Sequence, residues 1–177
     1  MNFKKLKLPL SRQELADLRA GEALELSGVL YCLRDAGHAR LLAELKEAQA
    51  LPYGLEGATL FYAGPTPKKG DAPFGAIGPT TASRMDFAAP ALYHAGIVAT
   101  IGKGPRAEAV IEACKQSGSV YFVATGGAAA FLAKHVVSCE TIAYDDLGTE
   151  ALNRIEVCDF PVFVGIDILG NDLYSRE

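Results

Sequence analysis

Residues 97–134 read IVATIGKGPRAEAVIEACKQSGSVYFVATGGAAAFLAK, and this stretch decides the fold class. Two apolar runs rich in β-forming residues, 97–101 and 120–124, each lead into a glycine-containing turn. Segments with helical character, about 105–116 and 127–134, follow these turns. Because strands that alternate with helices are typical of layered α/β folds, the stretch predicts two consecutive strand and helix units.

The same alternation continues towards the N-terminus. Residues 23–31 (ALELSGVLY) alternate in hydrophobicity like a strand with one buried face, and the apolar positions of 39–48 predict a helix after it. Upstream, Ser11 and Glu14 have the spacing of a capping box. This pattern predicts a short helix over 12–20.

A long irregular segment separates the N-terminal elements from this central stretch. Residues 58–63 (ATLFYA) predict a strand, whereas 64–79 hold too many Gly and Pro residues for regular structure. An ordered loop of this length is often functional, and a flexible surface excursion is the alternative. Residues 80–94 predict a helix in which Pro90 causes a kink or a division into two shorter segments.

Several strands follow one another near the C-terminus. We expect strands at 136–144, 154–157 and 161–167, with a short helical turn at 145–152. Strands joined without helices argue against a purely parallel sheet. No repeat or linker divides the sequence, so we expect one α/β domain over residues 1–177.

The composition indicates a globular protein with no general affinity for polyanions. Half of the 177 residues are hydrophobic, and 17 Lys and Arg against 21 Asp and Glu leave a net charge of -4. This balance predicts neither a nucleic acid nor an anionic membrane as partner. No apolar run approaches the roughly 20 residues that span a bilayer, and no signal peptide is evident, so we expect a cytoplasmic location.

The four cysteines do not form a metal-binding or disulfide pattern. They are Cys32, Cys114, Cys139 and Cys158, without a CxxC pair and without histidine at metal-ligand spacing. We expect reduced thiols that are partly buried, and no metal site in this chain.

Four short motifs place glycine, a hydroxyl or a cation where an element begins. They are RDAGH (34–38), GPTTASRMD (78–86), GKGPR (102–106) and TGGAAA (125–130). Free amides at a helix start, together with a hydroxyl and a guanidinium, suit a small oxygen anion. The candidate ligands for such an anion are Arg34, Thr80, Thr81, Arg84 and Lys103.

Each motif also has a purely structural interpretation. GPTTASR suits a helix cap with a solvated arginine, and GKGPR suits a tight turn because it lacks the full phosphate-loop spacing. TGGAAA suits close backbone packing. His38 either orients a substrate or acts in proton transfer, or it serves as a structural histidine. Spacing alone therefore reaches no further than a small anionic ligand.

Six stretches in one order carry a resemblance to a known family. They are RDAGH, YAGPTP, GPTTASRMD, IGKGPR, ATGGAAAFLA and IEVCDFPVFVGIDILGNDLY, and they extend over about residues 8–175. In this order they resemble the beta subunit, or C-terminal domain, of class I iron-sulfur fumarate hydratases. The related tartrate dehydratase beta subunit is similar too. The resemblance implies a swivelling β/β/α three-layer domain with a mixed sheet.

The resemblance also implies a partner, a reaction and roles for residues. A separate alpha subunit would hold a [4Fe-4S] cluster through three cysteine thiolates, and the hetero-oligomer would add water reversibly to fumarate to give (S)-malate. Arg34, Arg84 and Lys103 would bind the dicarboxylate, with Thr80 as proton acceptor. His38 and Thr81 would support them.

Two alternatives to a fumarate hydratase stay open. One is dehydration of tartrate by the same architecture, and the other is a module that binds dicarboxylates without chemistry. A threonine hydroxyl is a weak base, so the catalytic interpretation further requires an activating carboxylate from the alpha subunit.

Overall fold

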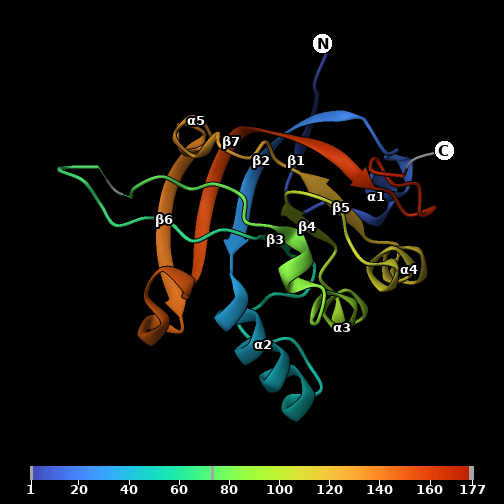
Figure 1. Cartoon of the computed structure of the whole chain (residues 1–177), viewed down its shortest axis with the longest axis horizontal. Helices are drawn as coiled ribbons and strands as arrows, with labels where there is room; N and C mark the ends of the chain where they lie inside the picture. Colours follow the sequence, from blue (N-terminus) through green and yellow to red (C-terminus); the bar gives the residue numbers. More distant parts are fainter. Residues whose placement is uncertain (1, 73, 176–177) are drawn as a thin grey trace.

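A computed structural model describes residues 2–72 and 74–175. The strands, in chain order, are β1 (Lys4–Lys7), β2 (Ala23–Cys32), β3 (Thr59–Phe61), β4 (Ala99–Gly102), β5 (Val120–Val123), β6 (Val136–Ala143) and β7 (Leu152–Ile166). They form one sheet in the order β1-β2-β3-β4-β5-β7-β6, and β2 also pairs with β7. This second pairing closes β2, β3, β4, β5 and β7 into a five-stranded barrel (Figure 1).

The sheet is mixed, as the sequence predicts. Neighbours from β1 to β5 are parallel, whereas β7 runs antiparallel to β2, β5 and β6. The carboxyl ends of β2, β3, β4 and β5 therefore lie at one end of the barrel. This arrangement confirms the mixed α/β class and brings the loops after four strands into one ring.

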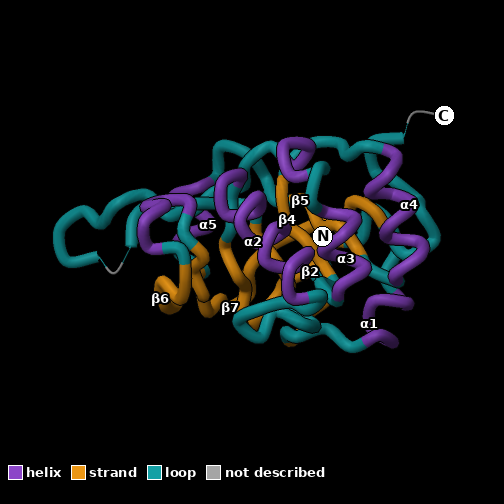
Figure 2. The backbone as a smooth tube through the Cα atoms, turned by 90° about the horizontal axis from the view of Figure 1, so that it is seen from below, coloured by secondary structure: helices purple, strands orange, loops and turns teal. Residues whose placement is uncertain are grey.

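Helices flank the barrel (Figure 2). They are α1 (Arg12–Asp17), α2 (Asp35–Ala48), α3 (Ala89–Ala95), α4 (Glu108–Ser117) and α5 (Ala129–Ala133), with 3-10 helices η1 (Ala82–Met85) and η2 (Asp145–Glu150). The two segments η1 and α3 confirm the division expected around Pro90, which lies in the first turn of α3.

Two clusters of buried side chains stabilise the fold. Alternate residues of the barrel strands, among them Leu30, Phe61 and Phe122, form one cluster together with residues of α1. The intervening residues, such as Leu60 and Tyr121, pack against α2, α3 and α4 in the other. The period-two alternation of each strand thus supplies one layer inside the barrel and one layer beneath the helices.

A buried ion pair ties the turn after β4 to the turn before α3. Arg106 is 7% exposed, and its Nε lies 2.7 Å from Oδ1 of Asp86. Oδ2 of Asp86 accepts a 2.7 Å hydrogen bond from the Ala107 amide. The Arg106 guanidinium also donates to the Thr100 hydroxyl at 3.3 Å and to the Tyr62 hydroxyl at 3.2 Å. Strands β3 and β4 and both turns are thereby held in one network.

Two predicted boundaries are wrong. The helix expected over 12–20 ends at Asp17, because the chain turns extended at Leu18 to bury that side chain in the barrel core. The strands expected at 154–157 and 161–167 are one strand, β7. Pro161 is tolerated because its nitrogen faces the edge of β7 away from β2, as the Val164 amide three residues later donates towards β2 at 2.9 Å. On that edge Pro161 lies between the part of β7 that pairs with β6 and the part that pairs with β5, so no ladder hydrogen bond is lost.

Two further features concern segments outside the predicted strands and helices. Strand β1 was not predicted, since only one residue of its sequence KKLK is buried. Within 64–79 the described residues form no helix or strand, as expected, and the segment projects beyond β6 (Figure 1). The base of this projection is closed by the Thr66 amide, which donates to the Ala76 carbonyl at 2.9 Å.

The buried pair predicts a large effect of Asp86→Ala on stability. Removal of one partner leaves the Arg106 charge unpaired in the core, so the free energy of unfolding in urea should fall by about 3–5 kcal/mol. Asp146→Ala, which breaks the exposed pair with Arg40, is the matched control and should leave the urea midpoint almost unchanged. Equal midpoints for the two variants would contradict a stabilising role of the network.

Candidate functional site

Backbone pairing places Thr80 beside Lys103 at the carboxyl end of the barrel. The Thr80 amide donates to the Tyr62 carbonyl at 2.7 Å, just after β3, and its carbonyl accepts from the Lys103 amide at 3.2 Å. Thr81 forms an isolated parallel bridge with Lys103. The Ala82 amide then donates to the Lys103 carbonyl at 2.9 Å. The segment that carries both threonines therefore runs alongside the ends of β3 and β4.

Arg84 is joined to the start of α2 by an ion pair. Its Nε and Nη2 atoms each lie 2.8 Å from Oδ2 of Asp35. Asp35 is the first residue of α2 and follows Arg34, which occupies the cap position after β2. The pair therefore unites the motifs 34–38 and 78–86 at one place on the molecule.

Two glycines permit close approach to the candidate cations. A Cβ at Gly126 would lie 3.1 Å from Cδ of Lys103, so the TGG turn passes directly beside the lysine side chain. A Cβ at Gly64 would lie 3.0 Å from Cδ of Arg34 and would clash with the Thr149 carbonyl. All four motifs predicted from the sequence thus converge on one end of the barrel.

Unsatisfied buried polar atoms mark the same place. Within the described part of the chain, four buried side-chain polar atoms lack a hydrogen-bond partner. Three of them, Nε of Arg34, Oδ1 of Asp35 and Nε2 of His38, belong to the first turn of α2 and its cap. Because buried polar groups are normally paired, this clustering is typical of a surface completed by a ligand or a partner chain.

His38 lies beneath Arg34 and is fully buried. Its Nδ1 is 2.8 Å from the Arg34 carbonyl, and its ring meets the Tyr62 ring edge-on with centroids 5.1 Å apart. Burial, with a smaller contribution from the Arg106 charge, lowers the pKa of His38 to about 4. The imidazole is therefore neutral at pH 7 and donates from Nδ1 to Arg34, which suits the supporting position expected for it.

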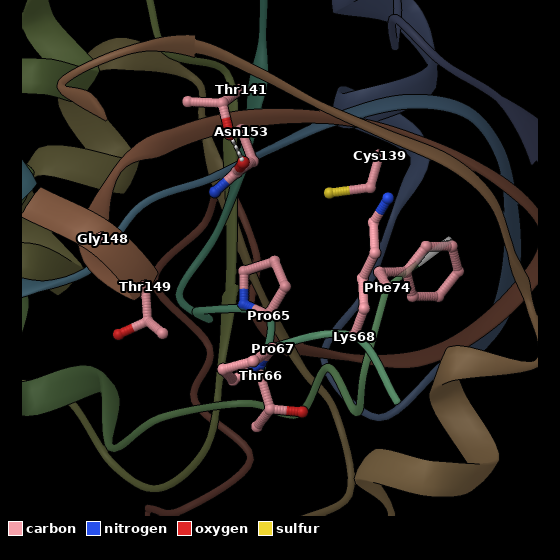
Figure 3. Close-up of a pocket in the computed structure, with 10 residues that line it drawn as sticks. All are labelled: Pro65, Thr66, Pro67, Lys68, Phe74, Cys139, Thr141, Gly148, Thr149 and Asn153. Atoms are coloured by element: carbon pink, nitrogen blue, oxygen red, sulfur yellow. Dashed lines mark hydrogen bonds between the residues drawn. The ribbon is translucent and has the colours of Figure 1, made fainter. Parts of the chain in front are cut away.

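A cavity of about 370 Å³ lies next to this end of the barrel (Figure 3). Its walls come from the 64–79 segment on one side and from β6, η2 and β7 on the other: Pro65, Thr66, Pro67, Lys68, Phe74, Cys139, Thr141, Gly148, Thr149 and Asn153. None of the sequence-predicted site residues lines it. The sequence singled out the long segment but gave no signal for the opposite wall, which long-range pairing creates.

The thiols of this chain do not fit an iron-sulfur cluster. Cys32 and Cys114 are buried in different core clusters, Cys139 is half-buried and Cys158 is exposed. Over residues 2–72 and 74–175, no group of three or more His, Cys, Asp or Glu side chains is placed to hold a metal. Any cluster used by this protein would need ligands from another chain or segment.

No helix in the described ranges is long and apolar enough to cross a membrane.

Comparison with known proteins gives consistent matches over the whole chain. The sequence model of a family described as "Fumarase C-terminus" matches residues 2–177. The chain is 38% identical over 175 residues to Fumarate hydratase 2 of Leishmania major, covering 97% of this chain and 31% of that protein. It is 36% identical over 165 residues to the anaerobic class I fumarate hydratase of Escherichia coli K12, covering 92% and 30%.

A second group of relatives has a different length. The L(+)-tartrate dehydratase subunit beta of Escherichia coli K12 is 34% identical over 177 residues, with 97% of this chain and 87% of that protein covered. This chain therefore spans less than a third of the fumarate hydratases that it matches, but most of the tartrate dehydratase subunit.

The buried imidazole predicts a specific acid sensitivity. The pKa of His38 falls from 6.5 to about 4 through burial, so between these values the unfolded chain binds a proton that the folded chain does not. Above pH 6.5 this difference does not affect the free energy of unfolding. As the pH falls from 6.5 towards 4, that free energy decreases, because the proton binds the unfolded chain more tightly. His38→Asn, which keeps a side-chain N–H near the position of Nδ1, should lose less stability than the wild type in urea unfolding between pH 7 and pH 5. An imidazole NMR titration of His38 near pH 6.5 would contradict this assignment.

Proposed function

Because this chain belongs to the fumarase C-terminus family of hydro-lyases, we propose that it is the beta-type half of a class I fumarate hydratase. The proposed reaction is the reversible addition of water to fumarate, giving (S)-malate. One observation carries the proposal: Arg34, Arg84, Lys103 and Thr80 come from three separate motifs and meet at one end of the barrel.

The three cations suit a substrate with two carboxylates. An arginine guanidinium matches a carboxylate with two parallel hydrogen bonds, whereas a lysine ammonium acts as a point charge. Arg84 is half-exposed and directed by Asp35, and Nε of Arg34 is buried without a partner. These residues would hold the dicarboxylate from two sides, with Lys103 beside the TGG turn.

Thr80 is the proposed proton acceptor at the carbon next to the hydroxyl-bearing carbon. Its amide and carbonyl are both hydrogen-bonded to the backbone of Tyr62 and Lys103, just after β3 and β4, so its side-chain hydroxyl is the group left to meet the substrate. A hydroxyl accepts such a proton only when a neighbouring group stabilises its deprotonated form. Asp35 and Asp86 are already paired with arginines, so the activating group is assigned to the alpha subunit.

The proposal therefore includes a hetero-oligomer. Residues 1–177 would form one swivelling β/β/α domain whose barrel end docks against an alpha subunit. The [4Fe-4S] cluster that the resemblance implies is assigned to that subunit, because the thiols described here do not converge. This chain would contribute substrate contacts and the threonine, with His38 and Thr81 in support.

A tartrate dehydratase is the second candidate. The identity of 34% to the Escherichia coli tartrate dehydratase subunit beta is close to the 36% and 38% found for the fumarate hydratases. The two activities act on four-carbon dicarboxylates, so the same cations would serve either substrate.

Reconstitution tests the proposed function. The purified chain is mixed under anaerobic conditions with its candidate iron-sulfur alpha subunit, and loss of the fumarate double bond is followed by ultraviolet absorbance. We expect turnover only in the mixture, with each subunit alone as control. Preferential turnover of tartrate would select the second candidate, and a mixture inactive on both acids would favour a module that only binds dicarboxylates.

The role of Thr80 predicts a selective loss of turnover. In the reconstituted complex Thr80→Ala should lower kcat by about 10²- to 10⁴-fold, because proton transfer loses its acceptor. Assembly with the alpha subunit, measured by co-purification, should not change. Thr141→Ala, which removes a hydroxyl from the wall of the neighbouring cavity, is the control and should retain full activity. A kcat for Thr80→Ala within about twofold of the wild type would contradict the role of Thr80 as proton acceptor.

A further inference from the structure

We propose that Asp35 is a positioning residue that aims the guanidinium of Arg84 at the substrate carboxylate. The inference rests on the proposed function, since it concerns the same anion site. Asp35 belongs to the RDAGH motif but is not among the candidate ligands, so the proposal gives it a role of its own.

One hydrogen-bonding edge of the Arg84 guanidinium contacts Asp35, and another is left for a substrate carboxylate. Arginine has five N–H donors, and one edge of the guanidinium presents Nε and Nη2 together. Both of these atoms lie 2.8 Å from Oδ2 of Asp35. The opposite edge, formed by Nη1 and Nη2, keeps its donors for a second carboxylate. Asp35 thus fixes the orientation of Arg84 and leaves a bidentate site available.

The two partners differ in how firmly the fold holds them. Asp35 begins the 14-residue helix α2, where a carboxylate is favoured by the helix dipole, and its side chain is 31% exposed. Arg84 lies in the four-residue helix η1, and its side chain is 50% exposed. A long side chain on a short helical turn has many orientations in solvent. The ion pair restricts these orientations by fixing the Arg84 guanidinium to a side chain of the longer helix α2.

The pair is also specific for Arg84. Oδ2 of Asp35 meets no other cation among the described residues, and Oδ1 is buried without a partner. Removal of the Asp35 charge should therefore act on Arg84 directly. Because exposed ion pairs contribute little to folding stability, a structural role alone predicts almost no change in substrate use.

The experiment compares substitutions in the reconstituted complex. Asp35→Asn should raise KM for fumarate or malate about 10- to 100-fold, with a smaller fall in kcat, because binding geometry is lost while Thr80 stays in place. Asp35→Glu should restore part of the affinity. In a double-mutant cycle, Asp35→Asn should add almost nothing to Arg84→Lys, since the lysine lacks the second edge.

A matched control concerns another ion pair of the same helix, with its carboxylate supplied by η2. Asp146→Asn removes a bidentate partner of Arg40, which is also on α2, and should leave KM and kcat unchanged. The Nε–H signal of Arg84, assigned in ¹⁵N NMR by its loss in Arg84→Lys, reports the ion pair in the free chain without any activity. We expect slow exchange of this proton in the wild type and fast exchange in Asp35→Asn.

The outcomes separate the two proposals. An active wild-type complex in which Asp35→Asn leaves KM unchanged, or in which the two substitutions are additive, overturns the positioning role and leaves the proposed function intact. Equal exchange of the Arg84 Nε–H in wild type and Asp35→Asn also overturns it. A wild-type complex inactive on fumarate, malate and tartrate removes the proposed function and the positioning role together, whatever the NMR signal shows.

Discussion

The antiparallel pairing of β2 with β7 closes the sheet, and the candidate site depends on that closure. The two strands pair from Ala23 with Phe163 to Cys32 with Asn153. Without this contact, the four parallel strands would form an open sheet whose end loops diverge as the strands twist. In a closed barrel the carboxyl ends of β2 to β5 form a ring instead. The loops that follow them are then close to one another, which is how residues of three motifs come together at the candidate site.

The buried pair of Arg106 and Asp86 performs a second task on the outside of the barrel. It fastens the GKGPR turn to the segment after η1, and its contacts with Tyr62 and Thr100 reach the strands themselves. The backbone of Tyr62 in turn holds the Thr80 amide. A charged network in the core is costly to desolvate. Its most direct effect here is to fix the GKGPR turn relative to the segment that follows η1. The backbone geometry around Thr80 is thus over-determined before any substrate or partner binds.

Local patterns were sufficient for the elements but not for the contacts between them. Alternation and glycine positions located most strands and the helices between them, because each pattern reports burial over a few residues. Strand β1 was not predicted, because only Leu6 of its four residues is buried and the strand therefore lacks an alternating pattern. The sequence did not predict that β7 is one continuous strand, because the effect of Pro161 depends on whether a strand is paired beside it. The convergence of the motifs was not predictable from the sequence, because it depends on which strands pair side by side. The bond from Arg84 to Asp35 likewise joins residues 49 positions apart and needed the tertiary structure.

The balance of charge at the barrel end is incomplete in this chain alone. Of the three candidate cations Arg34, Arg84 and Lys103, only Arg84 is paired with a carboxylate, that of Asp35, among the described residues, although the whole chain carries a net charge of -4. Like charges held close together raise the energy of the empty site, and a bound dianion lowers it by pairing with them. The orphan atoms in the first turn of α2 add a second deficit, in hydrogen bonds rather than charge. In the function proposed above, a dicarboxylate would compensate this charge and would also accept a hydrogen bond from Nε of Arg34, so one ligand would reduce both deficits.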